Sequence, residues 1–376
     1  MNIHAHYFDT PYGDVGKIVE ALDYLGIKRV RDTFVPWGRD RYLALAKAGV
    51  RFNVFLGREK PIPDFLALVK DVQAQVPGSV VSLEGGNESN FWPLTFNGRT
   101  DLNASVEAQA ALYQAVKADP ALKALPVANL TLGAWGADGH RLLGDMRDRC
   151  DFANVHIYFG GGGPPVSAFG YALGLGQIPA AGKPSVITET GYPTSHADGQ
   201  LGVDETTQAK QSLSLVMRAA LNGIRQTYFY ELVDQKPDPE RLDRERNFGL
   251  FRMDWSAKPA ASALRALTGL LGGPGAASGG SLAYQVENLP AGGQHVLFRT
   301  PDEGYAVAIW AEPDIWDEVG RKPLPAPASD VVVRLTWPTA FETFDPLIGA
   351  SPLTAGYGQA ITVRVSDHPV IVKLKP

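Results

Sequence analysis

The stretch RFNVFLGREKPIPDFLALVKDVQAQVPGSVVSLEGGNESN, residues 51–90, decides the fold because it contains one complete strand–helix–strand unit. The short apolar runs at 51–56 and 79–83 predict two strands. Between them, residues 63–76 carry apolar side chains at helical spacing. An alternation of this kind is typical of α/β folds with parallel strands.

The same alternation extends from residue 2 to about residue 270. The predicted strands are 3–8, 28–33, 51–56, 79–83, 126–131, 152–158, 185–188 and 226–231. Helical patterns cover 15–26, 41–49, 63–76, 105–118, 205–223 and 262–271, and the fifth of these ends at Asn222-Gly223, a favourable stop. Eight strand–helix units in this length predict a (β/α)8 barrel. The alternative, a doubly wound sheet, lacks a GxGxxG motif after the first strand.

A second domain is predicted after the barrel. The segment LGGPGAASGGS at 271–281 has the composition of a linker. Seven short β-type runs follow it, broken by Pro, Gly and Asp and without a helix: SLAYQVEN, HVLFRT, YAVAIWAE, DVVVRLTW, AFETFD, AITVRV and VIVKLK. They predict an antiparallel β-sandwich. We therefore expect a barrel over 1–272 and a sandwich over 280–376, the latter a structural appendage rather than a carbohydrate-binding module.

Composition excludes several classes of function. Of the 376 residues, 45% are hydrophobic and 20% charged, which indicates a folded globular chain, and the net charge of −5 without basic runs argues against nucleic acid. No segment is long enough to insert into a membrane. The only cysteine, Cys150, excludes an internal disulfide and a Cys-based metal site, and we expect it to be buried. The N-terminal MNIHAHYFDT has no signal-peptide pattern, so the protein is cytoplasmic, or secreted or periplasmic after loss of a signal peptide.

Two glutamates follow predicted strands at the end of a barrel where catalytic groups are found. Glu88 ends VVSLEGGNE after the fourth strand, and Glu189 ends PSVITE after the seventh. The ends of these two strands face each other across the mouth of an eight-stranded ring. Cleavage of a glycosidic bond needs two carboxyl groups, one on each side of the bond. Considered alone, each glutamate is equally well explained as a solvated loop residue or a partner in a structural ion pair.

The motifs EGGNE-x-N, HIY, ITETGYPT, YFYEL and NFGLFRMDWSAKP resemble those of clan A of the glycoside hydrolases, most closely bacterial barrels with an appended β-sandwich. The resemblance implies a retaining hydrolase of β-type linkages in an oligo- or polysaccharide. It implies that Glu88 is the general acid/base, with a raised pKa, and that Glu189 is the nucleophile. It further implies that Asn87 binds the sugar 2-hydroxyl, Arg31 keeps the nucleophile ionised and Tyr158 donates a hydrogen bond to it.

Other residues are predicted to contact the sugar. The resemblance assigns His156 a substrate or supporting contact. Clan members commonly carry a tryptophan at the end of the eighth strand, but this chain has Tyr230 and Glu231 there, so the sugar preference is left open. We expect the following residues to contact substrate as well: His6, Trp92, Trp135, Tyr230 and Glu231. Glu84 is expected to support the site from behind.

Two other functions remain as alternatives. His4-Ala5-His6 after the first strand is typical of metal-dependent amidohydrolase-like barrels. Such sites also need histidines from the fifth and sixth strands, and the fifth strand here has none. A catalytically inactive sugar-binding barrel is the second alternative, although pure binding needs no set of acid, nucleophile and ionising arginine. The sequence predicts no cofactor and no metal, and it indicates a carbohydrate as the partner.

Overall fold

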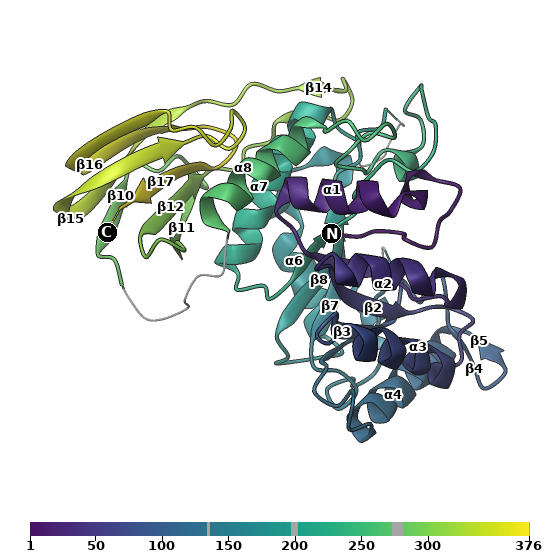
Figure 1. Ribbon diagram of the computed structural model, residues 1–376. Helices are drawn as coiled ribbons and strands as arrows, with labels where there is room; N and C mark the ends of the chain where they lie inside the picture. Colours follow the sequence, from purple (N-terminus) through teal and green to yellow (C-terminus); the bar gives the residue numbers. More distant parts are fainter. Residues whose placement is uncertain (134–135, 197–201, 273–280, 376) are drawn as a thin grey trace.

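A computed structural model describes residues 1–133, 136–196, 202–272 and 281–375. It consists of a parallel barrel followed by an antiparallel β-sandwich (Figure 1). The helices of the barrel are α1 (Val15–Leu25), α2 (Arg39–Lys47), α3 (Ile62–Gln75), α4 (Leu102–Ala118), α5 (Ala137–Arg141), α6 (Phe169–Gln177), α7 (Glu205–Leu221) and α8 (Pro259–Leu271). The barrel strands are β1 (Arg29–Asp32), β2 (Arg51–Leu56), β3 (Val80–Gly86), β6 (Val127–Ala128), β7 (Ala153–Tyr158), β8 (Ser185–Gly191) and β9 (Thr227–Phe229).

These strands and the N-terminal residues form a closed ring. Parallel ladders join β1–β2–β3–β6 and β7–β8–β9, and a bridge between Ala128 and Phe152 links the two groups. Asn2 closes the ring, since it bridges Arg31 on one side and donates its backbone N–H to the carbonyl of Phe229 at 2.7 Å on the other. The predicted eight-stranded barrel is therefore confirmed.

One predicted strand is wrong in extent. Residues 3–8 were expected to be extended, but the chain pairs only around Asn2 and then turns, with the N–H of Tyr7 donating to the carbonyl of His4 at 2.9 Å. The alternation of small and aromatic side chains resembles a strand, while its hydrogen bonds are those of a turn. This turn places His4 and His6 at the mouth of the barrel.

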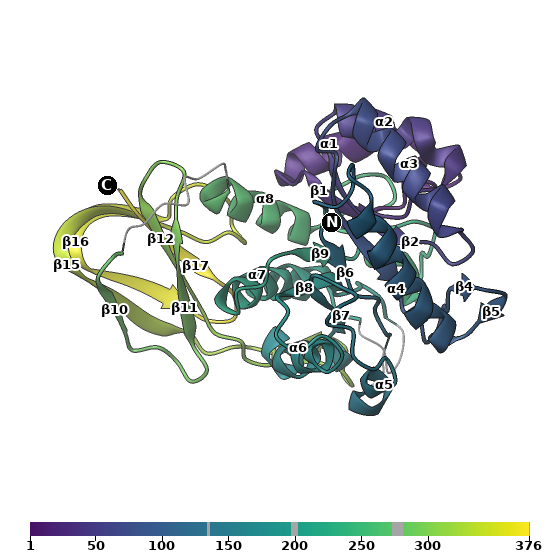
Figure 2. The same cartoon turned by 90° about the horizontal axis from the view of Figure 1, so that it is seen from below.

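Helices surround the strands and are fixed by local signals (Figure 2). Asp14, Asp101 and Asp204 cap α1, α4 and α7 by accepting a backbone N–H in the first turn. The predicted stop of α7 is confirmed, because Asn222 is its C-cap and Gly223 has a left-handed φ of 64°. A short β4–β5 hairpin (Thr95–Phe96, Arg99–Thr100) decorates the loop after β3. No helix among the described residues has the length and apolar character needed to cross a membrane.

The sandwich is built around two long bent strands. Its strands are β10 (Tyr284–Glu287), β11 (Gln294–Arg299), β12 (Tyr305–Trp310), β15 (Ser329–Phe344), β16 (Thr354–Val365) and β17 (Val370–Leu374), beside a small hairpin of β13 (Trp316–Asp317) and β14 (Lys322–Pro323). The first half of β15 pairs with β10 and its second half with β17, across an irregularity between Arg334 and Thr339. β15 therefore passes from one layer to the other, and valines and leucines of both layers form the core.

Partly buried ion pairs join the sandwich to the barrel. Arg218 of α7 bonds Glu312, which also accepts from the indole of Trp310. Lys210 of α7 bonds Asp367 at 2.7 Å. The predicted linker at 271–281 lies mostly outside the described residues. Cys150 is buried, as expected.

Candidate active site

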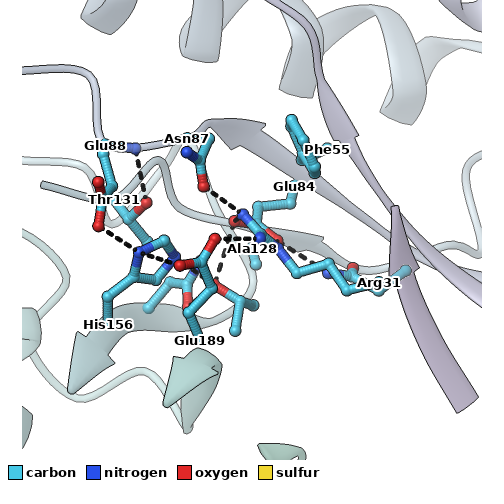
Figure 3. Close-up of polar contacts among 12 residues, drawn as sticks. Arg31, Phe55, Glu84, Asn87, Glu88, Ala128, Thr131, His156 and Glu189 are labelled. Atoms are coloured by element: carbon cyan, nitrogen blue, oxygen red, sulfur yellow. Dashed lines mark hydrogen bonds and ion pairs between the residues drawn. The ribbon is translucent and has the colours of Figure 1, made fainter. Parts of the chain in front are cut away.

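Arg31 is buried at the end of β1 and lies at the centre of a polar cluster (Figure 3). Its Nε and Nη2 donate to the two carboxyl oxygens of Glu84, each at 2.8 Å. Its Nη1 donates to Glu189 Oε1 at 2.6 Å, and its Nη2 also donates to Asn87 Oδ1 at 2.7 Å. Burial lowers the pKa of Arg31, but the charges of Glu84 and Glu189 outweigh burial and raise it. One guanidinium therefore bonds two buried carboxyl groups.

The glycines of LEGGNE allow this close packing at the end of β3. A Cβ on Gly85 would lie 1.7 Å from the side-chain oxygen of Gln109, and one on Gly86 would lie 2.5 Å from the hydroxyl of Ser89. A larger residue at either position would clash with these side chains. The glycines thus let Glu84 face the barrel interior while Asn87 and Glu88 reach the mouth.

Glu189 leaves the end of β8 and is held from two sides. Arg31 bonds one carboxyl oxygen, and the hydroxyl of Tyr158 donates to the other at 2.9 Å. Burial and the nearby carboxylate raise the pKa of Tyr158 well above its ordinary value, so this hydroxyl keeps its proton and remains a donor. His156 Nδ1 lies 3.4 Å from Glu189 Oε2. The carboxylate is therefore fixed in one orientation toward the mouth.

Glu88 has a left-handed backbone, with a φ of 42° that non-glycine residues rarely adopt. Its N–H donates to the hydroxyl of Thr131, and its carbonyl accepts from the N–H groups of Phe91 and Trp92. These bonds hold the unusual conformation. Its carboxyl group is 20% exposed, and His156 Nδ1 lies 2.9 Å from Oε1 (Figure 3).

The carboxyl groups of Glu88 and Glu189 face each other. One carboxyl oxygen of Glu88, one carboxyl oxygen of Glu189 and one ring nitrogen of His156 all lie within 4.8 Å of one another. Among the described residues this is the group of His, Cys, Asp and Glu side chains close enough to hold a cation. His4 and His6 belong to no such group within those ranges.

The pKa of Glu88 departs from the expected direction. Burial raises it, but the hydrogen bond and charge of His156, with weaker contributions from Arg31 and Arg244, outweigh burial and lower it. The prediction of a raised pKa is therefore wrong for the ligand-free protein. The reason is that His156 lies between the two carboxyl groups, a position that the sequence pattern does not reveal.

The far side of the mouth has a different character. Glu231 is fully buried, and its carboxyl group accepts from the Tyr12 hydroxyl at 2.9 Å and from the Gln235 amide at 2.8 and 3.0 Å. Burial raises its pKa well above the ordinary value. Its carboxyl is thus closed off from the mouth and lies behind His4, at 3.4 Å from Nε2. Tyr230 contacts the His4 ring edge to face, at 5.8 Å.

The ring-bearing residues predicted to contact the sugar differ in their exposure and in their neighbours. Trp92 is half exposed at the mouth and carries Arg58 over its ring at 5.3 Å. Trp135 lies outside the described residues. His6 lies beside Asp32, with Nδ1 at 3.3 Å from Oδ1.

Sequence reasoning missed the loop between β9 and α8. Arg244 and Glu245 on this loop interact electrostatically with the catalytic candidates. The charge of Arg244 contributes to lowering the pKa of Glu88, and the charges of Glu189 and Glu88 contribute to raising the pKa of Glu245. Buried Lys258, in the WSAKP motif, holds the loop by donating to Asp234 at 2.9 Å. The spacing of charged residues in RLDRERN gave no indication of which would face the site.

No protein-family model matches this chain, and no curated protein matches it in sequence. Its fold is similar to three solved structures over 100% of the chain. They are a family 39 glycoside hydrolase from the gut symbiont Bacteroides cellulosilyticus WH2 (16% identity, TM-score 0.63, 80% of that chain), a GH39 enzyme from Xanthomonas axonopodis pv. citri (16%, 0.63, 93%) and a monomeric β-xylosidase from Caulobacter crescentus CB15 (16%, 0.62, 96%). At these identities the likeness shows a shared fold, a barrel with a C-terminal β-sandwich.

Proposed function

We propose that this protein is a retaining glycoside hydrolase that cleaves β-type linkages in an oligo- or polysaccharide. The observation that carries the proposal is the facing pair of Glu88 and Glu189, with carboxyl oxygens within 4.8 Å. Retaining enzymes hold their carboxyl groups about 5–5.5 Å apart, and inverting enzymes roughly 6.5–9.5 Å. The short separation favours retention because it leaves no room for a water molecule between Glu189 and the sugar.

The surrounding residues suit the two steps of a double displacement. In the first step, Glu189 forms a bond to the anomeric carbon while the bond between that carbon and the leaving oxygen breaks. The leaving oxygen takes the proton of Glu88. In the second step, water attacks the anomeric carbon, Glu88 takes its proton and Glu189 leaves. Arg31 and Tyr158 stabilise Glu189 as an anion, which both steps require. Asn87, at the end of β3, is placed to bind the 2-hydroxyl group.

The lowered pKa of Glu88 also fits this scheme. His156 Nδ1 lies 2.9 Å from Glu88 Oε1, so Glu88 delivers its proton to the leaving oxygen from within a hydrogen-bonded pair. We expect the reaction to be fastest on the acid side of neutrality, where this proton is retained.

Substitution of the two glutamates tests the proposal. Glu189→Ala should abolish turnover on a panel of β-glycans, and azide should restore product of opposite anomeric configuration by replacing the missing nucleophile. Glu88→Ala should retain activity on aryl glycosides with activated leaving groups, which need no acid. Glu287→Ala, on the surface of the sandwich, is the matched control. Unchanged turnover in both site variants would refute the proposal, and turnover absent from the wild type on every glycan would favour the inactive sugar-binding barrel.

A metal-dependent hydrolase is the second candidate, because Glu88, His156 and Glu189 could also hold a cation. The amidohydrolase-like version using His4 and His6 has less support, since each of these rings lies against its own buried carboxyl group. Dialysis against a chelator separates the candidates. Chelator-resistant activity supports the glycosidase, and activity that returns only with added zinc or manganese supports the metalloenzyme.

A further inference from the structure

Two histidine–carboxyl pairs lie side by side where the N-terminal segment reaches the mouth. His4 faces Glu231 at 3.4 Å and His6 faces Asp32 at 3.3 Å, and the ring centroids of the histidines are 6.2 Å apart. Both carboxyl groups are fully buried, whereas the histidine side chains are 17% and 14% exposed. Each ring therefore has one edge toward a buried acid and keeps another open. The proposed mechanism uses neither pair.

A continuous row of rings connects these pairs to the nucleophile. Tyr158, which bonds Glu189, contacts Phe248 at 5.4 Å, and Phe248 contacts Tyr230 at 5.2 Å. Tyr230 contacts His4 at 5.8 Å. Beyond it, Tyr7 stacks on His4 at 4.8 Å and meets the edge of His6 at 4.4 Å. The histidines thus end a wall of the site that begins at Glu189.

The proposed chemistry fixes which part of the sugar meets this wall. The anomeric carbon must lie between Glu88 and Glu189, with the 2-hydroxyl beside Asn87. The β7 side is filled by His156, whose side chain is only 2% exposed. The sugar ring therefore extends over the opposite side, between β9 and β1, where the N-terminal segment lies. Its C3 and C4 hydroxyl groups point to the histidine end of the wall.

The buried acids lie against one edge of each ring. Glu231 accepts from Tyr12 and Gln235, and burial raises its pKa well above the ordinary value; its Oε2 lies 3.4 Å from His4 Nε2, which has no hydrogen-bond partner among the described residues. The pKa of His4 is lowered to about 3, mainly by burial, so the ring is neutral.

Asp32 accepts the N–H groups of Ala5 and Thr33, and its Oδ1 lies 3.3 Å from His6 Nδ1. Each ring therefore has its second nitrogen on the edge away from the acid, and a sugar hydroxyl group can donate to or accept from such a nitrogen.

We infer that His4 and His6, each oriented by its buried carboxyl group, bind the C3 and C4 hydroxyl groups of the sugar whose bond is cleaved. They thereby select the configuration at C4. This inference rests on the proposed function, because that function places the sugar. Glu231 and Asp32 are positioning residues in this arrangement and do not touch the substrate.

The test compares sugars that differ at one carbon. The probes are the 4-nitrophenyl β-D-glucoside, its C4 epimer the galactoside, its C2 epimer the mannoside, and the xyloside. The variants His4→Phe and His6→Phe keep an aromatic ring against Tyr7 but lose the hydrogen bond to the sugar. In each, the ratio of kcat/KM for the glucoside to kcat/KM for the galactoside should move closer to one by a factor on the order of ten. This is the effect of losing one hydrogen bond to a substrate hydroxyl group. The glucoside-to-mannoside ratio, set at Asn87, should not change. Glu231→Gln and Asp32→Asn should move the C4 ratio in the same direction by a smaller factor.

Structural damage would lower kcat/KM for all four probes by one factor and leave both ratios fixed, and this result would overturn the inference. Equal shifts of both ratios would overturn it as well. His295→Phe, a histidine on β11 of the sandwich, is the matched control. If the wild type cleaves none of the four probes, the inference is overturned as well. The proposed function is tested separately, by the glycan panel and the Glu189→Ala variant.

Discussion

Buried glutamates on the two sides of the barrel mouth have opposite kinds of hydrogen-bond partner, charged on one side and neutral on the other. On one side, Glu84 and Glu189 share the guanidinium of Arg31, which bonds both at 2.6–2.8 Å. On the other side, Glu231 is bonded by the neutral groups of Tyr12 and Gln235. Burial raises the pKa of Glu231 well above its ordinary value.

The difference shows that a strand-end glutamate is given its role by its partners. Glu189 lies near the end of β8, Glu231 follows the neighbouring strand β9, and both are buried. A cation beside a buried carboxyl group favours its charged form, whereas burial without a cation raises its pKa. In the proposed mechanism, one side of the mouth supplies charge for bond cleavage, and the other supplies neutral hydrogen-bonding groups for recognition.

Removal of the shared cation should have the largest effect. Arg31→Met leaves Glu84 and Glu189 buried and uncompensated, which should cost about 3–5 kcal/mol of unfolding free energy. Denaturant titration at pH 7.5 measures the loss. Arg39→Met, which breaks the surface pair with Asp71, is the control and should leave the midpoint unchanged.

Glu231→Gln should act with the opposite sign. A carboxyl group whose folded pKa is raised contributes full stability below its unfolded pKa, near the ordinary 4.5. That contribution is lost as pH rises toward the folded pKa, by about 1.4 kcal/mol per pH unit. Glutamine has no proton to lose, so the variant should gain on the wild type steadily above pH 4.5. A difference in unfolding free energy that does not change with pH would show that Glu231 is ionised in the folded protein.

Glu84→Gln is the matched change on the charged side and should destabilise. Glu84 is a bidentate acceptor for Arg31 and also accepts from Asn53 at 2.8 Å. A glutamine amide would turn its N–H₂ toward one of these donors, at a cost of about 1–3 kcal/mol. Denaturant midpoints of the two Glu→Gln variants at pH 7.5 make the comparison directly. If both variants moved in the same direction, the two sides would not differ in charge state.

The sequence predicted the charged side better than the neutral side. Glu88 and Glu189 could be located because parallel strands bring their ends to one face, and this rule needs only the strand positions. Arg31, Asn87 and Tyr158 were assigned through motif resemblance, and the structure brings all three to that face. The barrel itself followed from the strand–helix alternation.

The neutral side could not be predicted because its pairs join distant residues. Glu231 and His4 are brought together only when the ring closes, and nothing local distinguishes a buried protonated glutamate from an exposed one. The turn after Asn2, where a strand was predicted, decides where the histidines lie. The place of His156 between two carboxyl groups depends in the same way on the register of β7 against β8.

The smallest expected effect concerns this histidine. His156→Asn removes the hydrogen bond and charge that lower the pKa of Glu88 and leaves the burial that raises it. Glu88 should then keep its proton to higher pH, so the descending limb of the pH profile of kcat/KM should move to higher pH by a fraction of a unit to about one unit. His140→Asn, a buried histidine that contacts the carbonyl of Gly136, is the control and should leave the limb in place. A limb that moves to lower pH would mean that His156 stabilises the protonated form of Glu88. Glu88 would then not belong to the charged side of the mouth, which would include Glu84 and Glu189 alone.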